Sequence, residues 1–218
     1  AVNKVNKACR IAHIESKIVV ITGDAGVGKT VAVKKYVQEN PDVIHIEVIP
    51  YYTAKDVMSD IHRAVGYNGE GRLVDMFKHV CEKLKDTNRL LLVDEAELLP
   101  YRGLEMLRRL YDLTGIGLAL VGMPKLIRNM KGKGGEYKQL YSRVAVHAEI
   151  PSLKNYETAD SDIEILVKSV LPNSNGTWKK FANITRNART LENLIDQSIR
   201  IADKNNCEIT DEIIDRAK

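Results

Sequence analysis

Residues 18–30 have the sequence IVVITGDAGVGKT, in which an apolar run leads into a glycine-rich turn. The run IVVIT (18–22) is β-branched and has the character of a buried strand. The glycines that follow allow the backbone to turn its N–H groups inward, where they can bind an anion. This segment predicts a strand, a phosphate-binding loop and the first turn of a helix.

The turn matches the pattern GxxxxGK[ST] of a P-loop, which needs a strand before it and a helix after it. In this pattern the lysine, here Lys29, reaches the β- and γ-phosphates, and the hydroxyl of Thr30 binds Mg²⁺. We therefore predict a nucleotide site with Mg²⁺. Its predicted nucleotide-binding residues are Gly23, Asp24, Ala25, Gly26, Val27, Gly28, Lys29, Thr30 and Val31.

A second motif, LLLVDE, covers residues 90–95. Its apolar residues place Asp94 and Glu95 at the carboxyl end of a strand, where the ligand crevice of an open α/β sheet lies. Asp94 suits the Mg²⁺ shell, and Glu95 suits polarising the attacking water. The two acids also suit the N-terminus of a following helix, but the P-loop upstream favours the catalytic interpretation.

Strands alternate with helices around these motifs, which predicts a parallel, doubly wound sheet. Strands are expected at 18–22, 43–49, 89–95, 117–122 and 144–150. Helices are expected at 3–16, 29–39, 54–65, 72–85, 102–113 and 124–130. After Pro151 only helices are expected, at 157–170, 175–185, 189–205 and 210–217. The sequence thus predicts an α/β core over 1–152 and a small all-α domain over 153–218.

The composition is that of an ordinary globular chain, with 44% hydrophobic and 28% charged residues among 218. These values disfavour disorder and a coiled coil, and no apolar run is long enough to span a membrane. Cys9, Cys81 and Cys207 are too far apart for a zinc motif and odd in number for a disulfide framework. The expected compartment is the cytoplasm.

The net charge of +4 is concentrated in one segment, since residues 122–143 contain six basic residues and one acid. A solvated loop explains such a segment, and so does a patch that binds phosphates. The candidate phosphate-contacting residues in it are Lys125, Arg128, Lys131 and Lys133, which become candidates for DNA contact under the resemblance described next.

Four stretches together resemble, in order and spacing, the phage Mu B-type transposition proteins, AAA+ ATPases related to TnsC and IstB. They are ITGDAGVGKTVAVKKY, LLLVDEAELL, GIGLALVGMPKLIRNMKG and YKQLYSRVA. The resemblance implies an ATPase with a P-loop core and a helical lid. It also implies ATP-driven assembly into a filament on double-stranded DNA without sequence preference. The filament would recruit and activate a transposase, and hydrolysis would release it.

The same resemblance assigns roles to further residues. It makes Arg143 the arginine finger, which acts on ATP held by the neighbouring subunit, and Arg189 the sensor-2 arginine of the lid. It places Lys55 and Arg72 in loops that follow the DNA backbone. The sensor-1 position, usually Asn or Thr, is Met123 here or is displaced to Asn129. Because Met cannot orient a water or a phosphate, we predict slow turnover.

Two other classes of P-loop protein share these motifs. A helicase loader has the same DNA-associated AAA+ core, and a helicase partner would identify it. A STAND-type regulatory ATPase acts on protein partners and carries sensor or repeat domains beyond the ATPase, which this sequence does not contain.

Overall fold

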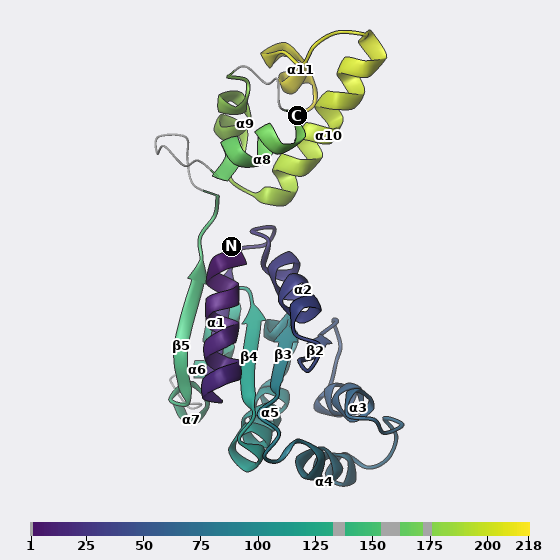
Figure 1. Cartoon of the computed structure of the whole chain (residues 1–218), viewed down its shortest axis with the longest axis vertical. Helices are drawn as coiled ribbons and strands as arrows, with labels where there is room; N and C mark the ends of the chain where they lie inside the picture. The colour runs from purple at the N-terminus through teal and green to yellow at the C-terminus, as the bar shows by residue number, and fades with distance from the viewer. Residues whose placement is uncertain (1, 133–137, 154–161, 172–175) are drawn as a thin grey trace. The chain divides into compact units, whose positions relative to one another are not determined.

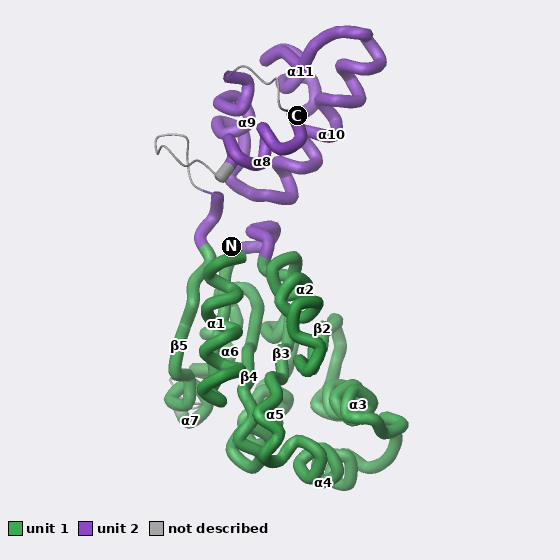
Figure 2. The backbone as a smooth tube through the Cα atoms, viewed as in Figure 1, with its two compact units in different colours: residues 1–23, 29–150 green, residues 24–28, 151–218 purple. Residues whose placement is uncertain are grey.

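A computed structural model describes residues 2–132, 138–153, 162–171 and 176–218 (Figure 1). The chain divides into two compact units (Figure 2). Unit 1 contains residues 1–23 and 29–150, and unit 2 contains residues 24–28 and 151–218. The loop between Gly23 and Lys29 therefore groups with the C-terminal helices, which the sequence did not predict.

Unit 1 is built on a five-stranded parallel sheet in the order β2-β3-β4-β1-β5, so the predicted sheet is confirmed. Its strands are β1 (Ile18–Gly23), β2 (Ile44–Glu47), β3 (Leu90–Asp94), β4 (Gly117–Gly122) and β5 (Val144–Ile150).

Helices cover the sheet of unit 1. Those before β3 are α1 (Val2–Glu15), α2 (Lys29–Glu39), α3 (Ala54–Ala64) and α4 (Leu73–Leu84). Those after β3 are the 3₁₀ turn η1 (Ala96–Leu98), α5 (Tyr101–Thr114), α6 (Lys125–Lys131) and α7 (Lys138–Tyr141). Helix α1 packs against α2 and against β1, β4 and β5, whereas α5 contacts α3, α4, α6 and α7.

Both faces of β1, an inner strand between β4 and β5, are buried. Ile18 and Val20 belong to a core that includes Met58 of α3 and Leu107 of α5. The alternate residue Val19 points to the opposite face of the sheet and is also fully buried. An apolar run without polar alternation is what a strand covered on both faces requires.

Two strands end earlier than the sequence predicts. Strand β2 ends at Glu47, and the chain then turns through Pro50 and Tyr51, where Tyr51 has φ +75°. Strand β3 ends at Asp94 because Glu95 adopts a left-handed conformation with φ +55°. The short elements η1 and α7 were not predicted.

Unit 2 contains four helices among its described residues: α8 (Asp162–Val170), α9 (Trp178–Ile184), α10 (Ala188–Asn205) and α11 (Asp211–Arg216). The predicted helical character of this region is confirmed, although residues 157–161 of the first expected helix lie outside the described residues. Fully buried Phe181 lies in its core with Val167 and Ile214. Lys180 of α9 pairs with Asp215 of α11 at 2.7 Å.

Among the described residues, the structure has no helix with the length and apolarity that a membrane span demands. Cys9 is buried, Cys81 is half-buried and Cys207 is exposed, and none of the three is paired. Burial raises the pKa of the Cys9 thiol to about 12, so this thiol stays protonated and acts as a small apolar core group.

His62 joins α3 to the loop that leads into α4. Its ring is 2% exposed, and Nδ1 accepts the N–H of Gly69 at 3.2 Å. Because Nδ1 accepts, Nε2 carries the proton and donates to Nδ1 of His79 at 3.3 Å. The ring also stacks on Tyr67, with centroids 4.4 Å apart. Burial, and secondly the neighbouring His79, lower the pKa of His62.

This arrangement predicts a pH-dependent stability. The pKa of His62 in the folded chain lies below its ordinary value of 6.5, so the unfolded chain binds more protons. The free energy of unfolding should therefore fall as the pH drops below that value. His62→Gln keeps an acceptor and a donor but does not titrate. Urea unfolding at about pH 7.5 and about pH 5.5 measures how far the free energy of unfolding falls between the two conditions. This fall should be smaller for the variant than for the unmodified chain, and an equal fall would contradict the prediction.

Candidate nucleotide-binding site

The loop after β1 has the backbone that a P-loop requires. Gly26 and Gly28 have φ values of +75° and +87°, which only glycine adopts at low cost. Lys29 follows as the first residue of α2. Its side chain is buried, and Nζ donates to the carbonyl of Gly23 at 2.8 Å. Thr30 is half-buried, whereas Val31 is 70% exposed.

Asp94 lies at the end of β3 and is completely buried. Its Oδ1 accepts the backbone N–H of Glu95 at 2.9 Å, and its Oδ2 has no hydrogen-bond partner among the described residues. An orphaned carboxylate oxygen at this edge fits a hard cation such as Mg²⁺. The described residues contain no cluster of three or more His, Cys, Asp or Glu side chains suited to a metal. Thr30 and Asp94 would hold Mg²⁺ together with phosphate and water oxygens.

Glu95 directly precedes η1 and has a left-handed backbone. Burial raises the pKa of its carboxyl group, and the nearby carboxylates of Glu97 and Asp94 raise it further. The positive charge of Lys29 acts in the opposite direction, so the two sequence motifs meet at one edge of the sheet. A carboxylate of raised pKa accepts a proton more readily, as a general base must.

Glu97 is a residue of this edge that the sequence analysis missed. It is 5% exposed, and it hydrogen-bonds the carboxyl group of Glu95. A Cβ added to Gly122 would lie only 2.2 Å from Oε2 of Glu97. The absence of a side chain at this glycine, which ends β4, therefore makes room for Glu97. Glu97 follows Glu95 by two residues in the sequence, and this short spacing could have indicated that their carboxyl groups lie close together. No recognised motif includes Glu97, so the sequence analysis did not select it.

The predicted sensor-1 position carries no polar group that faces the site. Met123 directly follows β4 and is 39% exposed. The amide of Asn129 donates to the backbone carbonyl of Glu97 at 2.9 Å. The side-chain amide of Asn129, which a sensor would use to bind a water or a phosphate, is therefore engaged in a hydrogen bond to η1.

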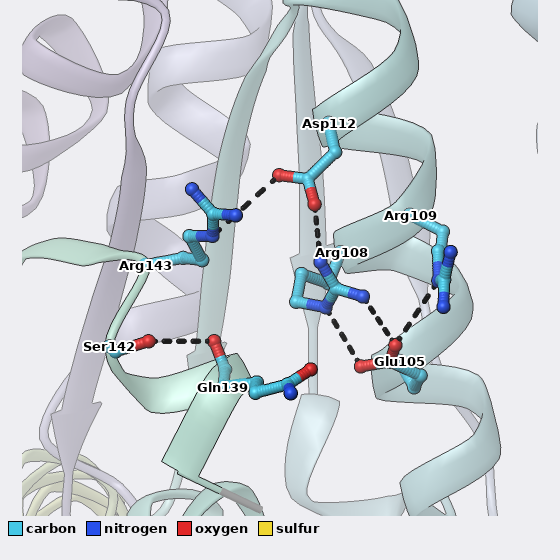
Figure 3. Close-up of polar contacts among 7 residues, drawn as sticks. All are labelled: Glu105, Arg108, Arg109, Asp112, Gln139, Ser142 and Arg143. Carbon is cyan, nitrogen blue, oxygen red and sulfur yellow. Dashed lines mark hydrogen bonds and ion pairs between the residues drawn. The ribbon is translucent and has the colours of Figure 1, made fainter.

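Arg143 lies far from the P-loop of its own chain. In the parallel pairing of β1 with β5, Ile18 is opposite Val144, whereas Gly23 is opposite Ile150. Arg143 is thus at the amino end of the sheet and the P-loop is at the carboxyl end, about 17 Å away at the usual rise of a strand. The Arg143 side chain is 57% exposed, and its Nε is 4.0 Å from Asp112 (Figure 3).

Within unit 2, the N-terminus of α10 is bonded to the glycine-rich loop. Asn187 caps the helix, since its Oδ1 accepts the N–H of Thr190 at 3.2 Å, and its amide donates to the carbonyl of Ala25. The carbonyl of Gly26 accepts the N–H groups of Ala188 at 3.0 Å and Arg189 at 3.4 Å. Arg189 thus meets the loop through its backbone, and Asn187 is a contact that the sequence did not reveal.

The candidate DNA-contacting residues after β4 differ in their surroundings. Lys125 and Arg128 are exposed on α6. Both line a hollow of about 610 Å³ together with Tyr52. Lys131 places its ammonium group 4.4 Å from the centre of the Tyr141 ring. Lys133 lies outside the described residues.

The other two candidates lie at the amino ends of α3 and α4. Lys55 is exposed in the first turn of α3. Arg72 precedes α4, and its guanidinium binds both oxygens of Asp75, at 2.7 Å and 3.2 Å. This hydrogen bonding raises the pKa of Arg72. The charge of Arg72 is partly compensated by Asp75 in this structure.

These observations agree with comparisons to known proteins. The family model described as "AAA domain" matches residues 13–130. The chain belongs to this family. It therefore carries an AAA ATPase domain, with the P-loop fold that the sequence predicted.

Two relatives of this AAA chain have names that refer to DNA transposition or to the activation of target DNA. "Mu-like prophage FluMu DNA transposition protein B" of Haemophilus influenzae is 33% identical over 157 residues, covering 70% of this chain and 55% of the relative. "ATP-dependent target DNA activator B" of Escherichia phage Mu is 27% identical over 205 residues, covering 92% of this chain and 64% of the relative. The chain thus spans less than two thirds of either relative.

A solved structure supports the fold of the AAA chain. The ORC2 protein of Aeropyrum pernix, in ADPNP and ADP complexes, aligns with a TM-score of 0.72 at 16% identity. The alignment covers 99% of this chain and 66% of the ORC2 chain.

The contact between the loop and α10 predicts a specific sensitivity at Gly26. A Cβ there would lie 2.2 Å from Oδ1 of Asn187, on a left-handed backbone. Gly66 is a matched control, because its φ is +98° but nothing lies within 4 Å. Backbone strain should lower the free energy of unfolding of both alanine variants by about 1–2 kcal/mol. Overpacking against Asn187 should lower that of Gly26→Ala by about 1–3 kcal/mol more.

Hydrogen exchange distinguishes the two variants. The amides of Ala188 and Thr190 are bonded at the affected end of α10, so Gly26→Ala should accelerate their exchange and Gly66→Ala should not. Unchanged exchange in Gly26→Ala would show that the loop does not hold this end of the helix.

Proposed function

We propose that this chain is an ATP-dependent activator of target DNA for a transposase of the Mu-like type. The observation that carries the proposal is that the loop before Lys29 follows β1 while Glu95 follows β3, at the same carboxyl edge of an AAA sheet. It is supported by relatives named DNA transposition protein B and ATP-dependent target DNA activator B. The proposed setting is the cytoplasm.

In this proposal the predicted site residues act on ATP. The inward N–H groups of residues 24–28 and the ammonium group of Lys29 bind the phosphates. Thr30 and Asp94 hold Mg²⁺, which supplies charge neutralisation at the phosphates. Glu95 accepts a proton from the attacking water. Arg189, in the helical lid proposed for 153–218, responds to the bound nucleotide.

The proposed ATPase is completed by a second copy of the chain. Arg143 lies at the opposite end of the sheet from its own P-loop. A neighbouring copy can present this arginine to the γ-phosphate, where positive charge stabilises the transition state. ATP binding would therefore favour assembly into a filament, and hydrolysis would favour its dissociation.

Hydrolysis is proposed to be slow in the single chain and faster in the assembly. Met123 offers no hydrogen bond to a water or a phosphate, and Asn129 is bonded to the backbone of Glu97. In the isolated chain the sensor-1 position then has no polar group, and Arg143 lies at the opposite end of the sheet from the P-loop. ATP would persist until a neighbour arrives.

The proposed DNA contacts are made to phosphates and are indifferent to sequence. The most favourable pair is Lys125 and Arg128, which are exposed and share a hollow with Tyr52. Lys55, Arg72, Lys131 and Lys133 remain candidates on the grounds of charge and position in the sequence. Such binding weakens steeply as salt rises.

Electron microscopy with long DNA tests this function directly. We expect filaments on duplex DNA with ATP and Mg²⁺ at low salt, and bare DNA without ATP. Lys29→Ala should form no filaments, because it removes the phosphate-binding cation. Bare DNA with ATP would overturn the proposal. A purified helicase that binds the chain where transposase does not would favour a helicase loader instead.

Two further variants separate assembly from hydrolysis. Glu95→Gln should bind ATP and form filaments, but it should dissociate slowly because the water is no longer activated. Arg143→Ala should bind ATP normally as a single chain and lose about a thousandfold or more in assembly-dependent turnover. Phosphate release and filament lifetime measure both effects. Rapid dissociation of the Glu95→Gln filament would remove Glu95 from its role.

A further inference from the structure

Arg143 faces a carboxylate from a different element of unit 1. Asp112 lies on α5, and its Oδ1 is 4.0 Å from Nε of Arg143. Its other oxygen is bound by the guanidinium of Arg108, one turn earlier on the same helix. Figure 3 shows Asp112 between the two arginines.

Arg108 holds Asp112 in place. Its side chain is 7% exposed, and a buried guanidinium needs paired charge on every side. Its Nε donates to Glu105 at 2.8 Å, so it binds one carboxylate from the preceding turn and one from the following turn of α5. The hydrogen bond to Glu105 raises the pKa of Arg108. Asp112 is therefore fixed by a permanently charged and nearly buried partner.

Arg143 is bound more loosely than Arg108. Its side chain is 57% exposed, and its 4.0 Å approach to Asp112 is at the limit of an ion pair. Pairs of this kind contribute little stability. The backbone of the turn is held separately, since the N–H of Arg143 donates to Leu140 at 3.3 Å and the hydroxyl of Ser142 donates to Gln139 at 3.0 Å.

We propose that Asp112 is a positioning residue for Arg143. A carboxylate anchored by Arg108 restricts the directions that the exposed guanidinium takes at the amino end of the sheet. The contact is weak enough for the arginine to transfer to the more highly charged γ-phosphate of a neighbouring copy. This inference rests on the finger role proposed for Arg143.

Steady-state ATP hydrolysis by the full chain on DNA tests the inference. Asp112→Asn keeps the size of the side chain and removes its charge, while Arg108 retains its bonds to Glu105. We expect kcat to fall about tenfold, as for a misplaced catalytic group, with the KM for ATP and the filaments unchanged. Asp112→Glu, which restores the carboxylate, should recover most of the turnover.

Glu39→Gln is the matched control. Glu39 is an exposed carboxylate on α2 that lies 4.0 Å from Lys35, the same separation as between Asp112 and Arg143, so this variant should retain its kcat. In an Arg143→Ala background, Asp112→Asn should cause no further loss, because Asp112 acts only through Arg143. A similar fall in kcat for Glu39→Gln, or a further loss in the double variant, would contradict the positioning role.

The outcomes also distinguish the positioning role of Asp112 from the finger role proposed for Arg143. Normal turnover by Asp112→Asn, while Arg143→Ala is inactive, would overturn the positioning role alone. Normal turnover by Arg143→Ala would overturn the finger role and the positioning role together. Should Asp112→Asn prove unfolded by its thermal transition, Asp112→Ala decides, because it removes the same charge with the residue that helices favour most. Full turnover by this variant would contradict the inference.

Discussion

The hydrogen bond from Nζ of Lys29 to the carbonyl of Gly23 closes the loop on which the rest of the site depends. It joins the end of β1 to the first residue of the following helix, across a turn that needs left-handed backbone at Gly26 and Gly28. The buried run of β1 fixes one end of this loop and the packing of α2 fixes the other. The cationic group is thereby held at the sheet edge where β3 delivers Asp94 and Glu95.

A parallel sheet imposes a second constraint, because all of its carboxyl ends lie on one side. Asp94 and Gly122 reach the same edge as Gly23, whereas the residue that precedes β5 lies at the other edge. Arg143 therefore lies beyond reach of its own loop however its side chain turns. The finger role proposed for Arg143 therefore requires a second copy of the chain, because strand direction and register keep this residue away from its own loop.

The sequence predicted the parts of the site that are encoded in short motifs. The P-loop and the acids after β3 were found because glycine, lysine and carboxylates recur there for fixed chemical reasons. Glu97, Asn187 and Asp112 were missed, since each acquires its role from a partner distant in the sequence: Gly122, Ala25 and Arg143 respectively. The left-handed Glu95 that ends β3 early was also missed, because β-branched and apolar periodicity carries no information on a single backbone angle.

Three features of unit 1 act in the same direction on the proposed chemistry. Met123 provides no polar group after β4, Asn129 is bonded to Glu97, and Arg143 is remote from the loop. Each lowers the stabilisation of a transition state in the single chain without weakening the binding of ATP, and only the third is reversed by a neighbour. In the function proposed above, such an ATPase would keep its nucleotide until it meets DNA and other copies. Hydrolysis would then be a consequence of assembly, and the contact that brings Arg143 to the next P-loop would set the lifetime of the bound state.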